Sequence, residues 1–542
     1  MKSYFSVIFT SAALLVSAQS YAQTPPDAGQ ILQQNQQDQL QPLAPSVDIE
    51  LNGTPLTTPA QGGIEIALKR IVITGNTVFS SQTLLNELGD TALAPKDIAG
   101  LWQLANQIST YYRQQGYAFA RAILPAQELS DGELTIQVIE GRYGEVDTTG
   151  DSALSGAVRP YLGIFESGEL INTEQLERQM LIVGDLPGVD ILPVMRPGNN
   201  VGEGDLLVTA QPAPRLAGYV GVDNHGNRYA GEYRMLGNVQ INRLLTLGDT
   251  LSVTALYTSE DTWLGGIGYS LPLGITGVRG FIDYAHTDYT LGKGFEGYEG
   301  RAKVTTAGLS YPLIRSQQRN LVVKAAYRYK ELDDEIRFAD VDRGTDSHSL
   351  PVTLQFDQRD SFAGGGVTFG ELSWTTGRIN VDAAQEGDDD YRFNKLNLQL
   401  ARQQSLASLS PALTLFTQFR GQWADRDFLD GSESFLLGGT QGVRAYPVGE
   451  GSDSKGLLAQ IELRYATQLG LQPYLFYDVG RSIRGDEDGH ARSISGAGFG
   501  ARYGYQSVNI DASLAWPLTG GDPQSDDKDD EPRIWVSATY QF

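Results

Sequence analysis

The sequence predicts an all-β transmembrane barrel of sixteen antiparallel strands, preceded by two small α+β repeats and an N-terminal plug helix. Three observations support this fold class. A secretory signal opens the chain, one β-α-α-β-β order occurs twice over residues 64–213, and alternating segments without a helical period fill residues 214–542. An even number of strands closes an antiparallel sheet without free edges.

Composition excludes several classes of protein. The 542 residues carry 41 Lys and Arg against 65 Asp and Glu, a formal net charge of -24. A nucleic-acid-binding protein needs clustered basic charge to neutralise phosphates, so that class is excluded. With no Cys and only 4 His, a disulfide scaffold, a thiolate metal site and a cysteine nucleophile are excluded as well. We expect no catalysis, no metal and no cofactor.

Residues 1–22 have the pattern of a secretory signal. Lys2 precedes an apolar run over residues 7–16, and small residues lead up to Ala22, so we expect cleavage after Ala22. No later stretch approaches the ~18 consecutive apolar residues that a membrane-spanning helix needs. The remaining classes are a soluble periplasmic protein and an outer-membrane β-barrel.

Residues 23–63 are rich in Gln and Pro. A helix over residues 28–40 is compatible with the sequence, but its only large apolar residues are Ile31, Leu32 and Leu40, too few for a core-facing stripe. Two interpretations stay open. One is a disordered leader, and the other is a helix, polar on nearly every side, that lies in a water-filled cavity.

Residues 64–142 predict a small α+β unit. Alternation gives a strand over residues 71–73, a short helix follows over 81–88, and two strands close the unit over 118–124 and 133–139. The longer second helix has one apolar face, because its large residues recur at 3,4,3,4 spacing. These residues are Ile98, Leu101, Ala105, Ile108 and Tyr112.

Residues 143–213 repeat this order of elements. The clearest signal is Asn172, an N-cap residue followed three positions later by Gln175, which predicts the start of the second helix. Two tandem copies of one small unit suggest a modular arm rather than an enzyme core.

Residues 214–542 contain sixteen short alternating segments, each near the ~9–11 residues that a tilted membrane strand requires. We expect long charged loops on the outer side, at residues 331–346, 382–390, 485–490 and 522–531, and short turns on the periplasmic side. Long outer loops and short periplasmic turns are typical of outer-membrane barrels.

The last strand shows both faces of the predicted sheet. Ile534, Val536, Tyr540 and Phe542 share one parity, which suits lipid, and the other parity is mostly polar. Trp535 departs from the polar set, and we expect its ring near a rim. The aromatic end of the chain, with Tyr540 and Phe542, resembles the signal by which such barrels reach their insertion machinery.

Several motifs in the repeats and at the barrel entrance support a family resemblance. They are residues 116–117 (Gly-Tyr), 122–125 (Ala-Ile-Leu-Pro), 138–141 (Val-Ile-Glu-Gly), 184–189 (Gly-Asp-Leu-Pro-Gly-Val) and 223–227 (Asp-Asn-His-Gly-Asn). Together they resemble the two POTRA domains and the barrel of two-partner secretion transporters, the TpsB family of the FhaC and ShlB type.

The resemblance implies a pore in the Gram-negative outer membrane. Its POTRA domains, in the periplasm, would capture the N-terminal secretion domain of a large partner exoprotein, which the barrel exports. The other expected partners are the lipid bilayer and, during biogenesis, the insertion machinery. The expected state is a monomer.

The longest connection between predicted strands, residues 424–456, contains Gly-Val-Arg-Ala-Tyr-Pro at 442–447. This resembles the tip of the superfamily's sixth extracellular loop, which folds back into the lumen, with Ala445 in place of the usual Gly. If that position requires a positive φ, Ala445 would be strained.

The resemblance also implies a lock between this loop and the lumen. In the family the loop Arg pairs with an Asp of the thirteenth strand, whose motif matches residues 476–480 (Phe-Tyr-Asp-Val-Gly), so Arg444 and Asp478 are the expected pair. Parity places Asp478 on the inward face beside Phe476, and Tyr446 completes the lock. The alternative is a solvated loop charge at Arg444. A wet ion pair contributes only ~0.2–1 kcal/mol. Further inward residues that could extend the network are Glu462, Arg464 and Arg502.

A sixteen-stranded barrel leaves an aqueous channel that must be occupied at rest. The candidates are the folded-in loop and the N-terminal helix; thirteen helical residues would rise ~20 Å. In relatives such a helix plugs the pore and moves out during transport. The repeats would supply recognition, because an exposed sheet edge can take an extended partner as an added strand. The candidate contact residues are Leu101, Tyr112, Arg121 and Ile123.

Two alternatives stay open. An assembly factor of the BamA or TamA type shares the barrel and the loop motif, but such relatives usually carry five or three POTRA domains. A passive porin or adhesin would show steady ion flux and no secreted partner. The sequence does not choose the partner, or decide whether the transporter also activates it.

Overall fold

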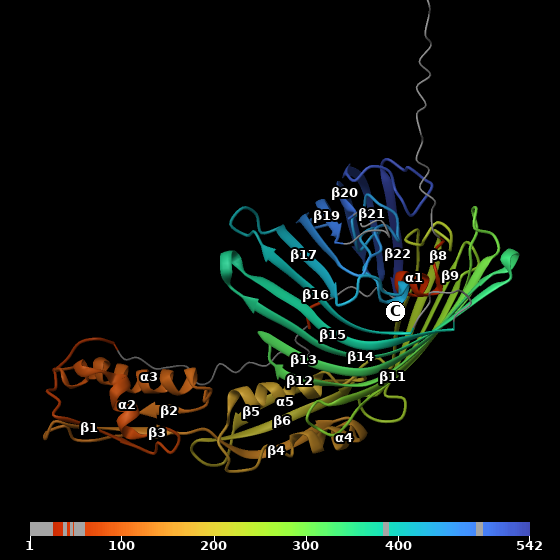
Figure 1. The fold of residues 1–542 in the computed structure, drawn as a ribbon. Coiled ribbons are helices and arrows are strands. Elements are labelled where there is room, and N and C mark those ends of the chain that lie inside the picture. The colour runs from red at the N-terminus through yellow and green to blue at the C-terminus, as the bar shows by residue number, and fades with distance from the viewer. Residues whose placement is uncertain (1–24, 36–40, 44–46, 48–59, 383–389, 484–490) are drawn as a thin grey trace, which may run out of the picture.

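The protein is described by a computed structural model covering residues 25–35, 41–43, 47, 60–382, 390–483 and 491–542. The predicted signal, residues 1–22, and the plug residue Leu40 lie outside the described residues. In Figure 1 the first repeat extends away from the barrel, while the second lies against one end of the barrel. Among the helices in the described part of the chain, none is long and apolar enough to cross a membrane.

Sixteen antiparallel strands close into one barrel, in which each strand pairs with its neighbours in sequence and β22 returns to β7. The predicted fold class is therefore confirmed. The strands are β7 (Leu216–Asp223), β8 (Arg234–Asn242), β9 (Thr250–Thr258), β10 (Trp263–Pro272), β11 (Arg279–Thr290), β12 (Tyr298–Arg315), β13 (Arg319–Ile336), β14 (Val341–Asp360), β15 (Gly366–Asp382), β16 (Tyr391–Ser405), β17 (Leu413–Ala424), β18 (Gly456–Tyr465), β19 (Leu471–Ser482), β20 (Ser493–Tyr505), β21 (Val508–Thr519) and β22 (Arg533–Gln541).

The four strands β12 to β15 are 17 to 20 residues long, twice the predicted length. The expected loop at 331–346 is therefore wrong: Glu331 pairs with Asp346 in the ladder, and only residues 337–340 connect the strands. Cross-strand ion pairs support this extension, such as Arg301 with Asp333 at 2.8 Å. Charged residues had suggested a loop, but opposite charges on adjacent strands also stabilise a ladder outside the membrane.

The two faces of the barrel follow the predicted alternation. On β19 the side chains of Leu475, Tyr477 and Val479 are exposed on the outer surface, whereas Asp478 between them is fully buried. Tyr540 and Phe542, the proposed insertion signal, are exposed as well. Trp535 is buried and faces the barrel interior, and it is the third residue of β22, close to the end of that strand.

The first repeat is a three-stranded sheet with two helices. β1 (Arg70–Thr74) pairs in parallel with the central β3 (Glu133–Ile139), and β2 (Arg121–Ile123) forms the antiparallel edge. The helices are α2 (Ser81–Leu88) and α3 (Ile98–Gln114), with the 3-10 turn η1 (Asp90–Leu93) between them.

The prediction is wrong for two of the four proposed partner-contact residues. Leu101 and Tyr112 are buried in the core of the first repeat and are not available to a partner. The helical period correctly identified one apolar face of α3, but that face packs on the sheet. Arg121 and Ile123, on the edge strand β2, are partly exposed.

The second repeat has the same plan. Its sheet order is β4 (Arg142–Gly150), β6 (Glu203–Pro212), β5 (Val189–Pro197), with helices α4 (Ser152–Leu162) and α5 (Thr173–Gly184). Asn172 caps α5 by accepting a hydrogen bond from the Gln175 amide at 2.9 Å, which confirms the predicted helix start. Its core is separate from that of the first repeat.

A buried carboxylate organises the first repeat. Glu140 accepts hydrogen bonds from the Thr77 amide at 2.7 Å, the Val78 amide at 2.9 Å and the Tyr112 hydroxyl at 2.9 Å. Burial raises the pKa of Glu140, but these hydrogen bonds outweigh burial and leave the pKa below its ordinary value. Glu140 thus ties α3 to the turn that follows β1.

We expect Glu140→Gln to make the first repeat less stable at neutral pH and to weaken its response to acid. A carboxyl with a lowered folded-state pKa stabilises the fold above its unfolded-state pKa and loses that contribution as pH falls through the folded-state pKa. The wild-type repeat should therefore lose amide-exchange protection over residues 70–139 below about pH 4. Glu133→Gln, which changes an exposed pair with Arg70, is the control; equal behaviour of both variants would contradict the prediction.

Candidate functional site

The connection between β17 and β18, residues 425–455 (loop 6), folds back into the barrel. Its side chains Leu437, Val443 and Tyr446 are buried against Leu458 and Phe476 of the barrel wall. The rest of this cluster comprises Phe435, Ala445, Tyr474, Ile494 and Ala515. The tip of the loop is thus packed as part of the barrel interior.

Arg444 lies at the centre of this contact. Its Nε and Nη2 donate to the two carboxylate oxygens of Asp478 at 2.8 and 2.7 Å, and its Nη1 donates to Glu462 at 2.5 Å. The backbone amide of Arg444 also donates to Asp478, at 3.1 Å. The guanidinium carbon lies 3.6 Å from the centre of the Phe476 ring, close enough for a cation–π contact.

The pair is dry, contrary to the expectation of a wet ion pair. Arg444 is 6% exposed and Asp478 is 0% exposed. Bidentate geometry and a second carboxylate offset the loss of water around the guanidinium. This ion pair does more than set the register of the loop, because removing Arg444 would leave the Asp478 carboxylate buried without a cationic partner.

The predicted inward residues lie together around Glu462. Arg464 pairs with this carboxylate at 2.6 Å, and Arg502 pairs with it at 3.2 Å. Arg502 also donates to Asp511, at 2.8 Å, which in turn accepts from the Tyr474 hydroxyl. Three arginines therefore share one glutamate, and the network joins β18, β19, β20 and β21.

Ala445 is accommodated without backbone strain. Its φ is not in the left-handed region, so the expected strain is not found. Its methyl group lies against Gly496 of β20, where an added Cβ would approach it to 2.5 Å. A glycine on the wall therefore leaves room for the alanine on the loop.

Two further residues hold the loop tip: Trp535, which the sequence did not assign to this contact, and Tyr446, which was predicted as part of the lock. Trp535 of β22 donates its indole N–H to the Arg444 carbonyl oxygen at 2.7 Å, and its break in the polar parity was the available signal. Tyr446 donates to the carbonyl oxygens of Thr519 and Gly521, both at 2.9 Å. The loop tip is thus held by the last two strands as well.

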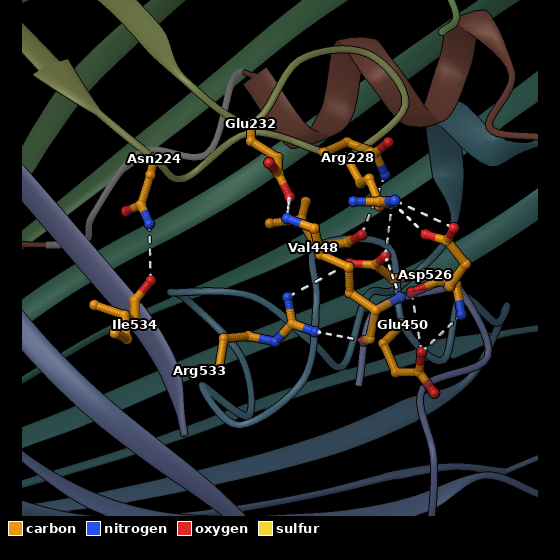
Figure 2. Close-up of polar contacts among 12 residues, drawn as sticks. Asn224, Arg228, Glu232, Val448, Glu450, Asp526, Arg533 and Ile534 are labelled. Atoms are coloured by element: carbon orange, nitrogen blue, oxygen red, sulfur yellow. Dashed lines mark hydrogen bonds and ion pairs between the residues drawn. The ribbon is translucent and has the colours of Figure 1, made fainter. Parts of the chain in front are cut away.

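Loop 6 also contacts the connections 224–233 and 520–532 of the barrel (Figure 2). Glu450, fully buried, accepts from the amides of Gln524 and Ser525 at 2.9 Å each and from Arg492 at 2.8 Å. Beside it, Arg228 of the first connection pairs with Asp526 at 3.3 Å. No sequence motif pointed to Glu450, because its partners lie in connections far apart in the chain.

The start of loop 6 is bound to the opposite wall. The 3-10 turn η4 (Gly431–Glu433) places Glu433 between Lys330 of β13 and Lys395 of β16, each at 2.6 Å. All three side chains are largely buried. Loop 6 therefore bridges the bore from β13 and β16 to β18 and β19.

The helix α1 (Ala28–Asn35) lies inside the ring of strands, beside η4 (Figure 1). Ile31 and Leu32 are buried in an apolar cluster with Tyr229, Tyr289 and Leu332, so the helix is not surrounded by water as expected. Gln33 donates to the Ser434 carbonyl oxygen of loop 6. A cavity of 1190 Å³ remains between α1, loop 6 and the wall.

Comparison with known proteins places this architecture. The model of a family described as "Haemolysin secretion/activation protein ShlB/FhaC/HecB" matches residues 202–503. The chain belongs to this family. A second model, "POTRA domain, ShlB-type", matches residues 66–141, the first repeat.

Relatives match over most of the chain. The heme/hemopexin transporter protein HuxB of Haemophilus influenzae is 28% identical and covers 100% of both chains. The outer membrane transporter CdiB of Escherichia coli is 25% identical over 82% of this chain and 77% of its own length. The solved structure of CdiB from Escherichia coli has a TM-score of 0.72 at 22% identity, covering 91% of this chain and 94% of that one. It supports the fold.

Membership of the ShlB/FhaC/HecB family determines how the protein is oriented in the membrane. The barrel lies in the outer membrane and the POTRA domains lie in the periplasm. The connections that follow β7, β17 and β21 therefore emerge on the extracellular side, because β7 directly follows the second repeat and these strands run in the same direction. The contacts around Glu450 join these three connections.

We expect Arg444→Ala to lower the free energy of unfolding of the barrel by about 3–5 kcal/mol, because Asp478 would stay buried without its counter-ion. The control is Arg301→Ala, which removes an exposed Arg–Asp pair of similar length and should cost about 0.2–1 kcal/mol. Denaturation in detergent micelles measures both. Similar small losses would show that the lock is not a buried ion pair.

Proposed function

We propose that this protein is an outer-membrane pore that captures a large partner exoprotein in the periplasm and exports it to the surface or the medium. The observation that carries the proposal is a lipid-spanning barrel whose bore is closed by two of its own segments, α1 and loop 6. A permanent channel has no use for a removable plug on a linker to periplasmic domains. Membership of a secretion/activation family supports the same conclusion.

Capture would occur at the edge of the first repeat. β2 is an edge strand of its sheet, and Arg121 and Ile123 on it are partly exposed. An extended segment of the partner could add to this edge by main-chain hydrogen bonds, with selection by neighbouring side chains. Leu101 and Tyr112 would act only indirectly, by holding α3 against the sheet.

The full-length likeness to a heme/hemopexin transporter gives the first partner to test, an exoprotein that handles heme or hemopexin. Since the periplasm supplies no ATP, folding of the partner outside the cell would give export its direction. A monomer would suffice, because one barrel contains the whole bore. Tyr540 and Phe542 would serve as the signal to the insertion machinery.

An assembly factor of the BamA type is the alternative, and two repeats rather than three or five argue against it. Co-expression with a large exoprotein encoded beside this chain, followed by assay of the medium, separates the functions. Secretion that depends on this protein, with normal levels of other outer-membrane proteins, is the expected result. Loss of other barrels from the membrane without secretion would support assembly instead.

We expect Ile31→Asp combined with Leu32→Asp to raise the resting conductance of the purified protein in planar bilayers. Two carboxylates would be forced into the apolar cluster of α1, at a cost of several kcal/mol, so the plug should leave the bore. Leu32→Met, which conserves volume, is the matched control and should behave as the wild type. Unchanged conductance in the double variant would show that α1 does not restrict the bore.

A further inference from the structure

A short stretch of the linker lies at the periplasmic end of the bore. The amide of Leu43 donates to Oδ2 of Asp357 at 3.3 Å, and the carbonyl oxygen of Leu43 accepts from Nη2 of Arg359 at 2.7 Å. Both partners lie among the last four residues of β14. Two side chains thus bind the N–H and the C=O of one linker residue, as a neighbouring strand would.

Asp357 is oriented by other bonds. It is 3% exposed, and its Oδ1 accepts from Asn320 of β13 at 3.0 Å and from Nη1 of Arg359 at 2.8 Å. The Arg359 amide donates to the Gln318 carbonyl oxygen at 2.7 Å. The two groups that hold Leu43 therefore keep their positions through contacts to the barrel itself.

The contacts continue into the second repeat. Arg315 donates to Asn320 at 2.9 Å. It also donates hydrogen bonds to both carboxylate oxygens of Asp185, at 2.7 Å each. Asp185 is the C-cap residue of α5, and the Arg315 side chain is almost fully buried. An unbroken hydrogen-bonded path therefore runs from the second repeat through Arg315, Asn320 and Asp357 to the linker.

We propose that Asp357 and Arg359 form a docking site for extended polypeptide backbone of any sequence, which the linker occupies at rest and the exported chain occupies as it enters. This inference rests on the proposed export function. Both bonds are made to main-chain atoms, which every residue except proline offers in the same form. Hydrogen bonds to charged groups are the stronger ones, so the site can hold a chain without reading its side chains.

The position of the site fits this role. It lies on the face of β14 opposite the exposed side chains of Val352 and Leu354, and the Arg315–Asp185 pair joins it to the second repeat. Arg315 and Asn320 are positioning residues, since Asn320 donates to Asp357 and Arg315 joins Asn320 to Asp185.

A cysteine at position 47 reports on occupancy. The chain has no Cys, and Val47 is only 5% exposed, so Val47→Cys in the full chain should react slowly with a charged maleimide. A synthetic peptide of alternating Gly and Ser, added on the periplasmic side, should displace the linker and accelerate labelling. The same peptide with N-methylated amides lacks the N–H donor and should have little effect.

Arg359→Gln in this background should accelerate labelling about tenfold without any peptide, because one hydrogen bond to a charged group is lost. The matched control is Arg402→Gln, which breaks a 2.8 Å Arg–Asp pair with Asp360 at the same end of β14 and involves none of the described linker residues. Asp185→Asn should produce a smaller acceleration, since it acts through Arg315. Arg402→Gln should label at the parent rate.

Equal acceleration by the plain and the N-methylated peptide, or by Arg359→Gln and Arg402→Gln, would overturn the proposal. Labelling that responds to the peptide in the parent but not in Arg359→Gln would support it. The readout is occupancy, not export. A protein that fails to secrete its partner but still shows these labelling differences would refute the export function and leave the docking site standing.

Discussion

The interior of this barrel depends on one buried arginine. Arg444 is removed from water, and its charge is stable there only because Asp478 and Glu462 present their oxygens in the plane of its guanidinium group. That requirement specifies the register of loop 6, because a shift of one residue would separate Arg444 from the buried carboxylate of Asp478. Trp535 and Tyr446 then add neutral hydrogen bonds that only this register allows.

The plug depends on the loop. α1 contacts η4 at the start of loop 6 and a small group of apolar side chains on the wall, whereas the loop itself is held at η4, at Arg444 and at Glu450. A helix of eight residues with one buried face has few contacts to lose. We therefore expect the bore to open by departure of α1 while loop 6 stays in place.

The two parts of the N-terminal segment are held by different kinds of interaction. α1 buries apolar side chains, so its seat selects Ile31 and Leu32, but the linker is held through the main chain of Leu43. The first kind of contact is specific to this helix, and the second is open to any extended chain. Through Arg315 and Asp185 the second contact is also connected to the second repeat.

Local patterns carried much of the prediction. The period of two placed Asp478 inside and Leu475 outside, and the cap at Asn172 gave the start of α5, because each depends on residues adjacent in sequence. Patterns misled where one signal has two causes. The helical spacing of apolar residues in α3 marks a face that is buried, but it does not say whether the sheet or a partner covers that face. Leu101 and Tyr112 were therefore assigned to a partner surface, whereas they lie in the core of the repeat.

By itself the sequence determined the closed sixteen-stranded barrel, the two repeats and the identity of Arg444 and Asp478, since strand period and motif are written along the chain. Only the tertiary structure decided that this pair is dry, that Glu433 lies between two lysines, and that Leu43 lies between Asp357 and Arg359. Burial and long-range hydrogen bonds arise when distant segments meet, and no local spacing encodes which ones will.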